Sequence, residues 1–138
     1  MKVAEQSVST RWLAVVVLAI GILVASVIPV PAATPRTDPT GSIDTTTLLH
    51  IAGYATLAAG GVVAVAREGW PGDHRSRRVE ISAVAGVVTL VALFGVGTEV
   101  LQGFIPWRTL AVAEIGLNAA SAAVGGLLAT MWFYRPVE

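Results

Sequence analysis

Four long apolar runs constrain the fold of this chain more than any other feature of its sequence. Residues 12–30 contain no charged side chain, and residues 47–66 contain one ionisable side chain, His50. Two further runs cover residues 81–105 and 110–134. A bilayer core about 30 Å thick takes about 20 apolar residues per helix, so each run is long enough to cross it. The runs therefore predict four transmembrane helices.

The composition and the chemistry of the lipid environment support this class. Of the 138 residues, 54% are hydrophobic and 13% are charged, which lies outside the range of ordinary soluble domains. Backbone groups in lipid must form hydrogen bonds within their own segment, and runs of this length do so as helices, not as strands of a barrel. We predict that residues 1–138 form one all-α domain, an integral membrane bundle of four helices. The absence of Cys excludes disulfides and thiolate metal sites.

The first run has two interpretations. Lys2 and Arg11 precede it, and the small-residue sequence VPA at 30–32 ends it, which is typical of a cleaved signal peptide. However, the run is longer than the core of about 7 to 15 residues found in signal peptides, which favours a retained helix. The sequence leaves both interpretations open.

Basic residues beside the runs predict the orientation in the membrane. Seven of them lie on the side of the two termini and the 67–80 loop, whereas Arg36 and Arg108 lie on the other side. By the positive-inside rule we expect a multi-pass protein of the cell membrane with both termini in the cytoplasm. The formal net charge is zero and the basic residues lie beside the spans, so we predict no nucleic-acid binding.

Polar residues interrupt three of the runs near their outer ends. They form pairs spaced three or four residues apart: His50 and Tyr54, Glu99 and Gln102, and Glu114 and Asn118. Such spacing puts both members of a pair on one face of a helix. Ionisable groups in hydrocarbon cost several kcal/mol unless they face the bundle interior and find partners. We therefore expect the three pairs to meet at one end of the bundle.

The residue types indicate a site for a polar head group. Arg108, in the short connection between the third and fourth runs, offers a planar donor fork for phosphate or carboxylate. Burial and a nearby guanidinium act in opposite directions on a carboxyl group, so one acid can be neutral while its neighbour is ionised. The predicted acid/base residues are Glu99, His50 and Glu114, and the predicted head-group ligands are Arg108, Gln102, Asn118 and Tyr54.

Catalysis and metal binding have weaker support. No nucleophile with a dedicated base is evident, so the sequence does not decide between an enzyme and a binding protein. His50, Glu99 and Glu114 could supply metal ligands, but no zinc-type spacing such as H-E-x-x-H occurs. We therefore predict no metal and no cofactor.

The motifs together resemble those of a known family. The resemblance is carried by H-x-x-x-Y at 50–54, E-x-x-Q at 99–102, P-x-R at 106–108, and then an acid, Asn118 and Gly125. This order is similar to that of the VanZ-like family of small membrane proteins. The resemblance implies a four-helix protein of the cell envelope, in a family whose founding member is associated with low-level resistance to the glycopeptide teicoplanin. The chain departs from the family pattern in several places: Thr46 and Thr47 replace an Asp-Lys pair, Glu114 replaces an Asp, and Ser121 replaces a Gly.

Two functions fit these features. In the first, the polar cluster binds or modifies the head group of a membrane lipid or of a lipid-linked envelope precursor, and thereby affects glycopeptide susceptibility. In the second, the protein is a non-catalytic structural or partner-binding protein whose polar cluster only locks the packing of the helices. The sequence does not identify a protein partner.

Overall fold

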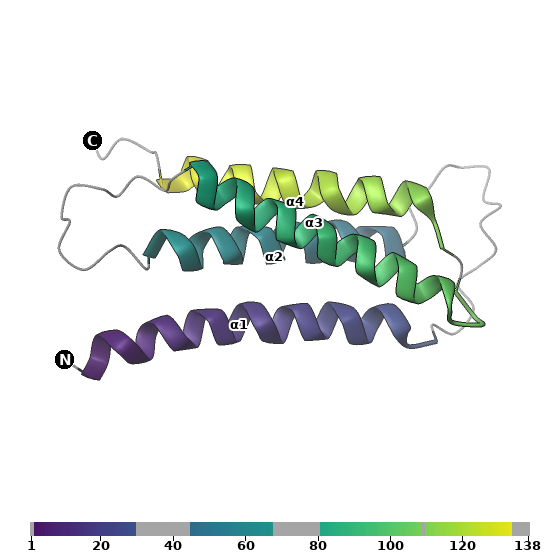
Figure 1. Cartoon of the computed structure of the whole chain (residues 1–138), viewed down its shortest axis with the longest axis horizontal. Helices are drawn as coiled ribbons and strands as arrows, with labels where there is room; N and C mark the ends of the chain where they lie inside the picture. The colour runs from purple at the N-terminus through teal and green to yellow at the C-terminus, as the bar shows by residue number, and fades with distance from the viewer. Residues whose placement is uncertain (1, 30–44, 68–80, 109, 134–138) are drawn as a thin grey trace.

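The computed structural model describes residues 2–29, 45–67, 81–108 and 110–133, and this part of the chain is helical without strands. The helices are α1 (Lys2–Val27), α2 (Thr45–Arg67), α3 (Ile81–Gly103) and α4 (Val112–Phe133), as Figure 1 shows. Each is long and apolar enough to cross a membrane. The predicted all-α bundle of four membrane-spanning helices is thus confirmed.

The helix ends differ from the ends of the apolar runs for local reasons. α1 begins at Lys2 instead of residue 12, since residues 2–11 contain neither Gly nor Pro and helix formation does not require apolar residues. α1 ends at Val27 because Pro29 disfavours helical geometry at the preceding residue. α3 ends at Gly103, ahead of Pro106.

The connection between α3 and α4 consists of tight turns. Backbone hydrogen bonds run from Phe104 N to Leu101 O at 3.1 Å, from Ile105 N to Gln102 O at 3.0 Å and from Arg108 N to Ile105 O at 3.0 Å. Pro106 occupies the second position of the last turn, which its fixed φ favours. These turns reverse the chain within a few residues and place α4 beside α3.

The helices alternate in direction, so distant segments meet at each end of the bundle. The start of α1 and the end of α4 lie at one end, and the start of α2, the end of α3 and the start of α4 lie at the other (Figure 1). α2 packs most extensively against α4, whereas α1 lies to one side and contacts mainly α2. The polar residues of α2, α3 and α4 therefore come to the same end.

Small residues allow α2 and α4 to approach closely. A Cβ atom added at Gly125 would overlap the backbone of Ala55, and one at Gly126 would lie 2.6 Å from a methyl group of Val88. Without a hydrophobic driving force between helices in lipid, such close backbone contact is a main source of helix association. Gly125 thus fixes the distance between the two helices.

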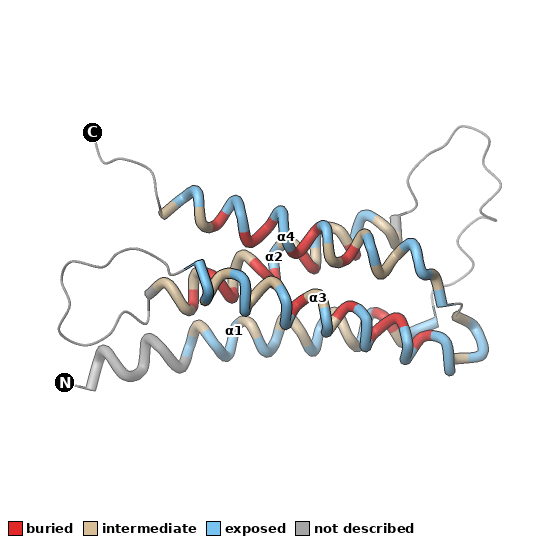
Figure 2. Tube along the Cα trace, turned by 45° about the horizontal axis from the view of Figure 1, so that its top comes forward, coloured by how far each residue is buried: buried red, intermediate tan, exposed pale blue. Residues whose placement is uncertain are grey.

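The interior changes in character along the bundle. Its middle is apolar and contains Tyr54, Leu57, Ala58, Val91 and Ala122, against which half-buried α1 residues pack. Figure 2 shows that the buried positions of α2, α3 and α4 face one another, while outward positions are exposed. The end that holds the α3–α4 connection is polar inside. The buried polar residues of the described chain are Ser26, His50, Thr98, Glu99, Gln102, Asn118 and Ser121.

Candidate polar site at one end of the bundle

Three ionisable side chains converge at the polar end, each from a different helix. His50 lies in the second turn of α2, Glu99 in the last turns of α3 and Glu114 in the first turn of α4. Because α3 runs opposite to α2 and α4, its end lies beside the starts of those two helices (Figure 1). The N-terminal end of α4 also favours the negative charge of Glu114. We call His50, Glu99 and Glu114 the polar triad.

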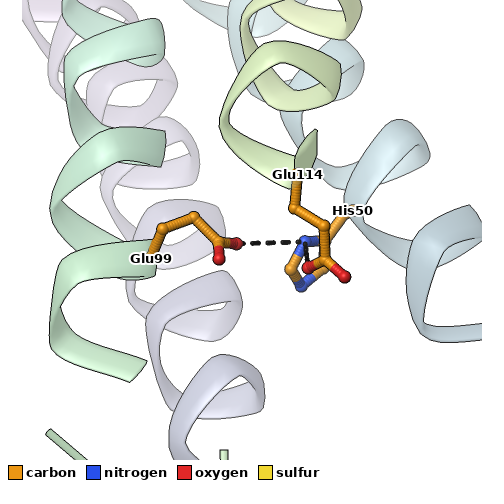
Figure 3. Close-up of side chains that lie close together, drawn as sticks. All are labelled: His50, Glu99 and Glu114. Atoms are coloured by element: carbon orange, nitrogen blue, oxygen red, sulfur yellow. Dashed lines mark ion pairs between the residues drawn. The ribbon is translucent and has the colours of Figure 1, made fainter. Parts of the chain in front are cut away.

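The triad is centred on the imidazole ring. His50 Nδ1 lies 3.5 Å from Glu114 Oε2 and 3.8 Å from Glu99 Oε1. Figure 3 shows the Glu99 carboxyl group pointing across to the ring and the Glu114 carboxyl group beside it. Glu99 is fully buried and His50 is 7% exposed, whereas Glu114 is half-buried. The two carboxyl groups and the imidazole ring thus lie close together and are largely shielded from solvent.

Asn118 and Tyr54 lie next to the triad, toward the middle of the bundle. Asn118 Nδ2 donates to Glu99 Oε1 at 3.5 Å. The Tyr54 hydroxyl lies 2.5 Å from Thr98 Oγ1, which itself donates to Gly95 O at 2.8 Å. Since the single Thr98 hydroxyl proton is used in that bond, Tyr54 is the donor to Thr98. The Tyr54 hydroxyl is therefore engaged inside the bundle and not aimed at the triad.

Three side chains at the end of α3 and in the connection bind the last carbonyl groups of α1. The hydrogen bonds, each 3.3 Å long, are Gln102 Nε2 to Ser26 O, Trp107 Nε1 to Val27 O and Arg108 Nη2 to Ala25 O. The final carbonyl groups of a helix lack partners within the helix, and Pro29 cannot supply an N–H. We call these three side chains the α1 anchor.

Several polar atoms at this end have no hydrogen-bond partner. Among the described residues, the buried side-chain atoms without one are His50 Nδ1, Glu99 Oε2, Arg108 Nε and Asn118 Oδ1. The charge of Arg108 acts on both His50 and Glu99. An unpaired buried polar atom costs about 1–3 kcal/mol, so donors and acceptors gathered in this way suit a ligand that would satisfy them.

The structure brings four of the seven predicted site residues together and gives the other three different partners, of which Tyr54 is bonded to Thr98. His50, Glu99, Glu114 and Asn118 come together, as the spacing predicted. Gln102 and Arg108, predicted as head-group ligands, donate hydrogen bonds to α1, and Arg108 Nε has no hydrogen-bond partner. The reason is that the α1 carbonyl groups are the nearest acceptors left without backbone partners.

Sequence reasoning missed three contributors to this end of the bundle. Thr98 lies beside Glu99 and shares a helix face with Gly95 and Gln102, so the same spacing could have found it. Trp107 has an exposed ring in the structure, and the sequence around it gave no indication of an acceptor for its N–H group. Ser26 is the lone polar residue in the last turns of the first run, and its carbonyl group, not its side chain, accepts the bond from Gln102.

Comparison with models of protein families, with curated proteins and with solved structures finds no match for this chain. The resemblance to the VanZ-like family therefore stays a prediction from the motifs of the sequence. The four membrane-spanning helices and the polar triad are properties of the chain itself.

Proposed function

We propose that this chain is a VanZ-like protein of the cell envelope that binds the phosphate or carboxylate head group of a membrane lipid or lipid-linked envelope precursor. The observation that carries the proposal is the polar triad, in which the buried atoms His50 Nδ1 and Glu99 Oε2 lack hydrogen-bond partners, at the bundle end where Arg108 Nε also lacks one. Intramembrane ionisable groups are costly, and where they persist they mark functional sites by default.

The proposed orientation places this end at the outer face of the cell membrane. Basic residues gather beside the opposite end, which the positive-inside rule assigns to the cytoplasm. A head group of the outer leaflet would reach the half-buried Glu114 first, and Arg108 Nε would meet its negative charge. The resemblance to the VanZ-like family links such a site to glycopeptide susceptibility.

The triad also contains groups suited to proton transfer. His50 and Glu99 are residue types that give and take protons, and His50 Nδ1 lies 3.8 Å from Glu99 Oε1, so a head-group atom bound between them could exchange a proton with either. A covalent mechanism would need a nucleophile, and the buried Ser121 hydroxyl is occupied by donating to Leu117 O at 2.7 Å. We therefore propose that the site binds a head group and that any chemistry on the bound group would be general acid/base catalysis.

The experiment compares lipids that copurify with the protein and lipids of the whole cell. The Glu114→Gln variant keeps the size of a half-buried side chain and removes its charge, and Ser121→Ala is a matched control that removes only an intrahelical hydrogen bond. Native mass spectrometry should show an anionic lipid or precursor on the wild type and on Ser121→Ala. In Glu114→Gln its occupancy should fall about tenfold, because the Glu114 carboxylate would accept a hydrogen bond from a hydroxyl or ammonium group of the head group, and hydrogen bonds to charged groups contribute about 1.5–3 kcal/mol.

Each outcome separates the candidate functions. A new or missing lipid species in cells that express the wild type, but not Glu114→Gln, would favour catalysis over binding. Equal lipid occupancy in all three proteins would contradict the head-group site.

The second candidate function, a structural role, is favoured by the α1 anchor, because Gln102 and Arg108 already stabilise helix packing. It predicts that Glu114→Gln fails to accumulate in the membrane or unfolds at lower temperature, with no change in lipids. Measuring accumulation and thermal unfolding beside lipid occupancy therefore distinguishes the two roles.

A further inference from the structure

We infer that the polar triad is a binding site for a single divalent transition-metal ion of the Zn²⁺ or Mn²⁺ type. His50, Glu99 and Glu114 each offer one ligand atom, and these three atoms lie within 4.8 Å of one another. The triad thus supplies one nitrogen and two oxygen ligands from three helices (Figure 3). The inference does not depend on head-group binding, which concerns the same end of the bundle.

The distances fit a shared cation better than direct hydrogen bonds. N–H···O bonds in proteins are about 2.7–3.2 Å long, whereas His50 Nδ1 lies 3.5 Å from Glu114 Oε2 and 3.8 Å from Glu99 Oε1. Ligands about 2.0–2.2 Å from a tetrahedral zinc ion lie about 3.3–3.5 Å apart. The three ligand atoms lie within 4.8 Å of one another, so binding one ion would draw them closer together by side-chain rotation.

Unpartnered buried atoms point independently to a ligand. Glu99 is fully buried and its Oε2 has no hydrogen-bond partner, and the same holds for Nδ1 of His50, which is 7% exposed. His50 Nδ1 faces the centre of the triad, since it lies 3.5 Å from Glu114 Oε2 and 3.8 Å from Glu99 Oε1, and Glu99 Oε2 belongs to the same carboxyl group. A metal ion takes lone pairs from a neutral imidazole and from carboxylates, so it would satisfy these groups without hydrogen bonds.

Charge balance supports the same occupant. Two carboxylates in a low-dielectric interior repel each other, and the nearby Arg108 guanidinium is already used in part to bind Ala25 O. One divalent cation cancels the charge of two carboxylates. The donor set of one imidazole and two carboxylates is suited to Zn²⁺ and Mn²⁺, and three protein ligands leave a position open for a further ligand.

Linear spacing could not reveal this arrangement. The prediction that no metal binds was based on the absence of motifs such as H-E-x-x-H, which place two ligands on a single helix. Here the ligands come from α2, α3 and α4, and Glu99 is separated from His50 by about a third of the chain. Asn118, which donates to Glu99 Oε1, would orient that carboxylate as an outer partner.

The test uses the full-length protein, purified in mild detergent with an affinity tag free of histidine. The chain has no Cys and only one other His, His74, so background binding to the protein is low and a His74→Asn variant measures part of it. Zn²⁺ or Mn²⁺ is added alone, unbound ion is removed by dialysis, and bound metal is counted by mass spectrometry. We expect about one ion per chain in the wild type and in His74→Asn.

The variants decide whether the ion occupies the triad. Glu99→Gln and Glu114→Gln keep side-chain size, and each should weaken binding by at least about tenfold, the smallest loss seen when even an outer partner of a metal is removed. Ser121→Ala on the same helix as Glu114 should bind like the wild type. Visible absorption of the Co²⁺-loaded wild type provides a second measurement, with bands of a four-coordinate ion that the two Gln variants should lack.

Other results would overturn the inference. If the wild type retains neither Zn²⁺ nor Mn²⁺, or retains no more than Glu99→Gln, the triad binds no metal. Circular dichroism shows whether each variant is folded. If Glu99→Gln is unfolded, the metal content of Glu114→Gln, in which the substituted side chain is half-buried, is the result that tests the site. Lipid occupancy is measured separately from bound metal. A protein that binds no metal could still bind a head group, and a protein that binds no head group could still bind a metal.

Discussion

α1 and the unit formed by α2, α3 and α4 are equally suited to lipid but are held in different ways. Only 6% of the α1 membrane span is buried, against 39% of the α2 span. α1 packs through half-buried aliphatic side chains and is bound at one end by the α1 anchor. The other three helices share close glycine contacts and the polar triad. Hydropathy therefore identifies spans, whereas small and polar residues decide which spans form the core.

The substitution expected to have the largest effect on the unit of α2, α3 and α4 is Gly125→Ala. The added methyl group would overlap the Ala55 backbone, so α2 and α4 must separate or the bundle must distort. Overpacking of this kind costs about 1–3 kcal/mol and occasionally more, and we expect the upper end because backbone cannot rotate away. Thermal unfolding in detergent, followed by circular dichroism, measures the loss.

Gly116→Ala provides the matched control on the same helix. A Cβ atom at Gly116 meets nothing within 4 Å, so stability should change by less than about 1 kcal/mol, in the direction of greater stability, since Ala favours helix over Gly. Equal destabilisation by both substitutions would mean that α4 tolerates no added volume anywhere, and the special role of Gly125 would be wrong.

A smaller effect is expected from the Tyr54–Thr98 hydrogen bond, which joins α2 to α3 inside the core unit. Tyr54→Phe should lower the free energy of unfolding by about 1 kcal/mol, because one neutral buried hydrogen bond is lost. A double-mutant cycle with Thr98→Ala should give a coupling energy of similar size. Thr130→Ala is the control, since the bond that the Thr130 hydroxyl donates runs to Gly126 O of its own helix. Additive effects of Tyr54→Phe and Thr98→Ala would show that the bond contributes nothing.

The positions of polar residues in the sequence predicted which faces of α2, α3 and α4 point inward. Exposing a polar side chain to lipid is costly, so the face that carries such side chains is expected to face the bundle interior. His50, Glu99 and Asn118 are buried for this reason. The partners of Gln102 and Arg108 were not predictable in the same way. Those side chains bind backbone carbonyl groups of α1, and backbone groups are present at every residue, so no side-chain pattern marks the ones left unbonded. The positions of these unbonded carbonyl groups depend on where α1 ends, which Pro29 determines.

The smallest expected effect concerns the α1 anchor. Gln102→Leu removes the donor to Ser26 O but leaves the contacts between α2 and α4 intact. An interhelical hydrogen bond in a membrane protein contributes about 0.6 kcal/mol, which corresponds to about a threefold shift in the docking of the α1 end. The chain has no native Cys, so this shift can be measured as the rate of disulfide cross-linking between Ile22→Cys and Gly53→Cys, whose side chains would meet near that end.

A second cysteine pair makes the measurement specific to the anchored end. Val15 and Gly60 lie against each other farther along the same two helices, so the pair Val15→Cys and Gly60→Cys should cross-link at an unchanged rate in Gln102→Leu. If both pairs slow equally, α1 detaches as a rigid rod and aliphatic packing along its length is too weak to hold it alone. If neither slows, the hydrogen bond to Ser26 O does not position α1. Slowing confined to the Ile22–Gly53 pair would show that the polar anchor and the apolar contacts hold separate parts of α1, because each acts only over the turns it touches.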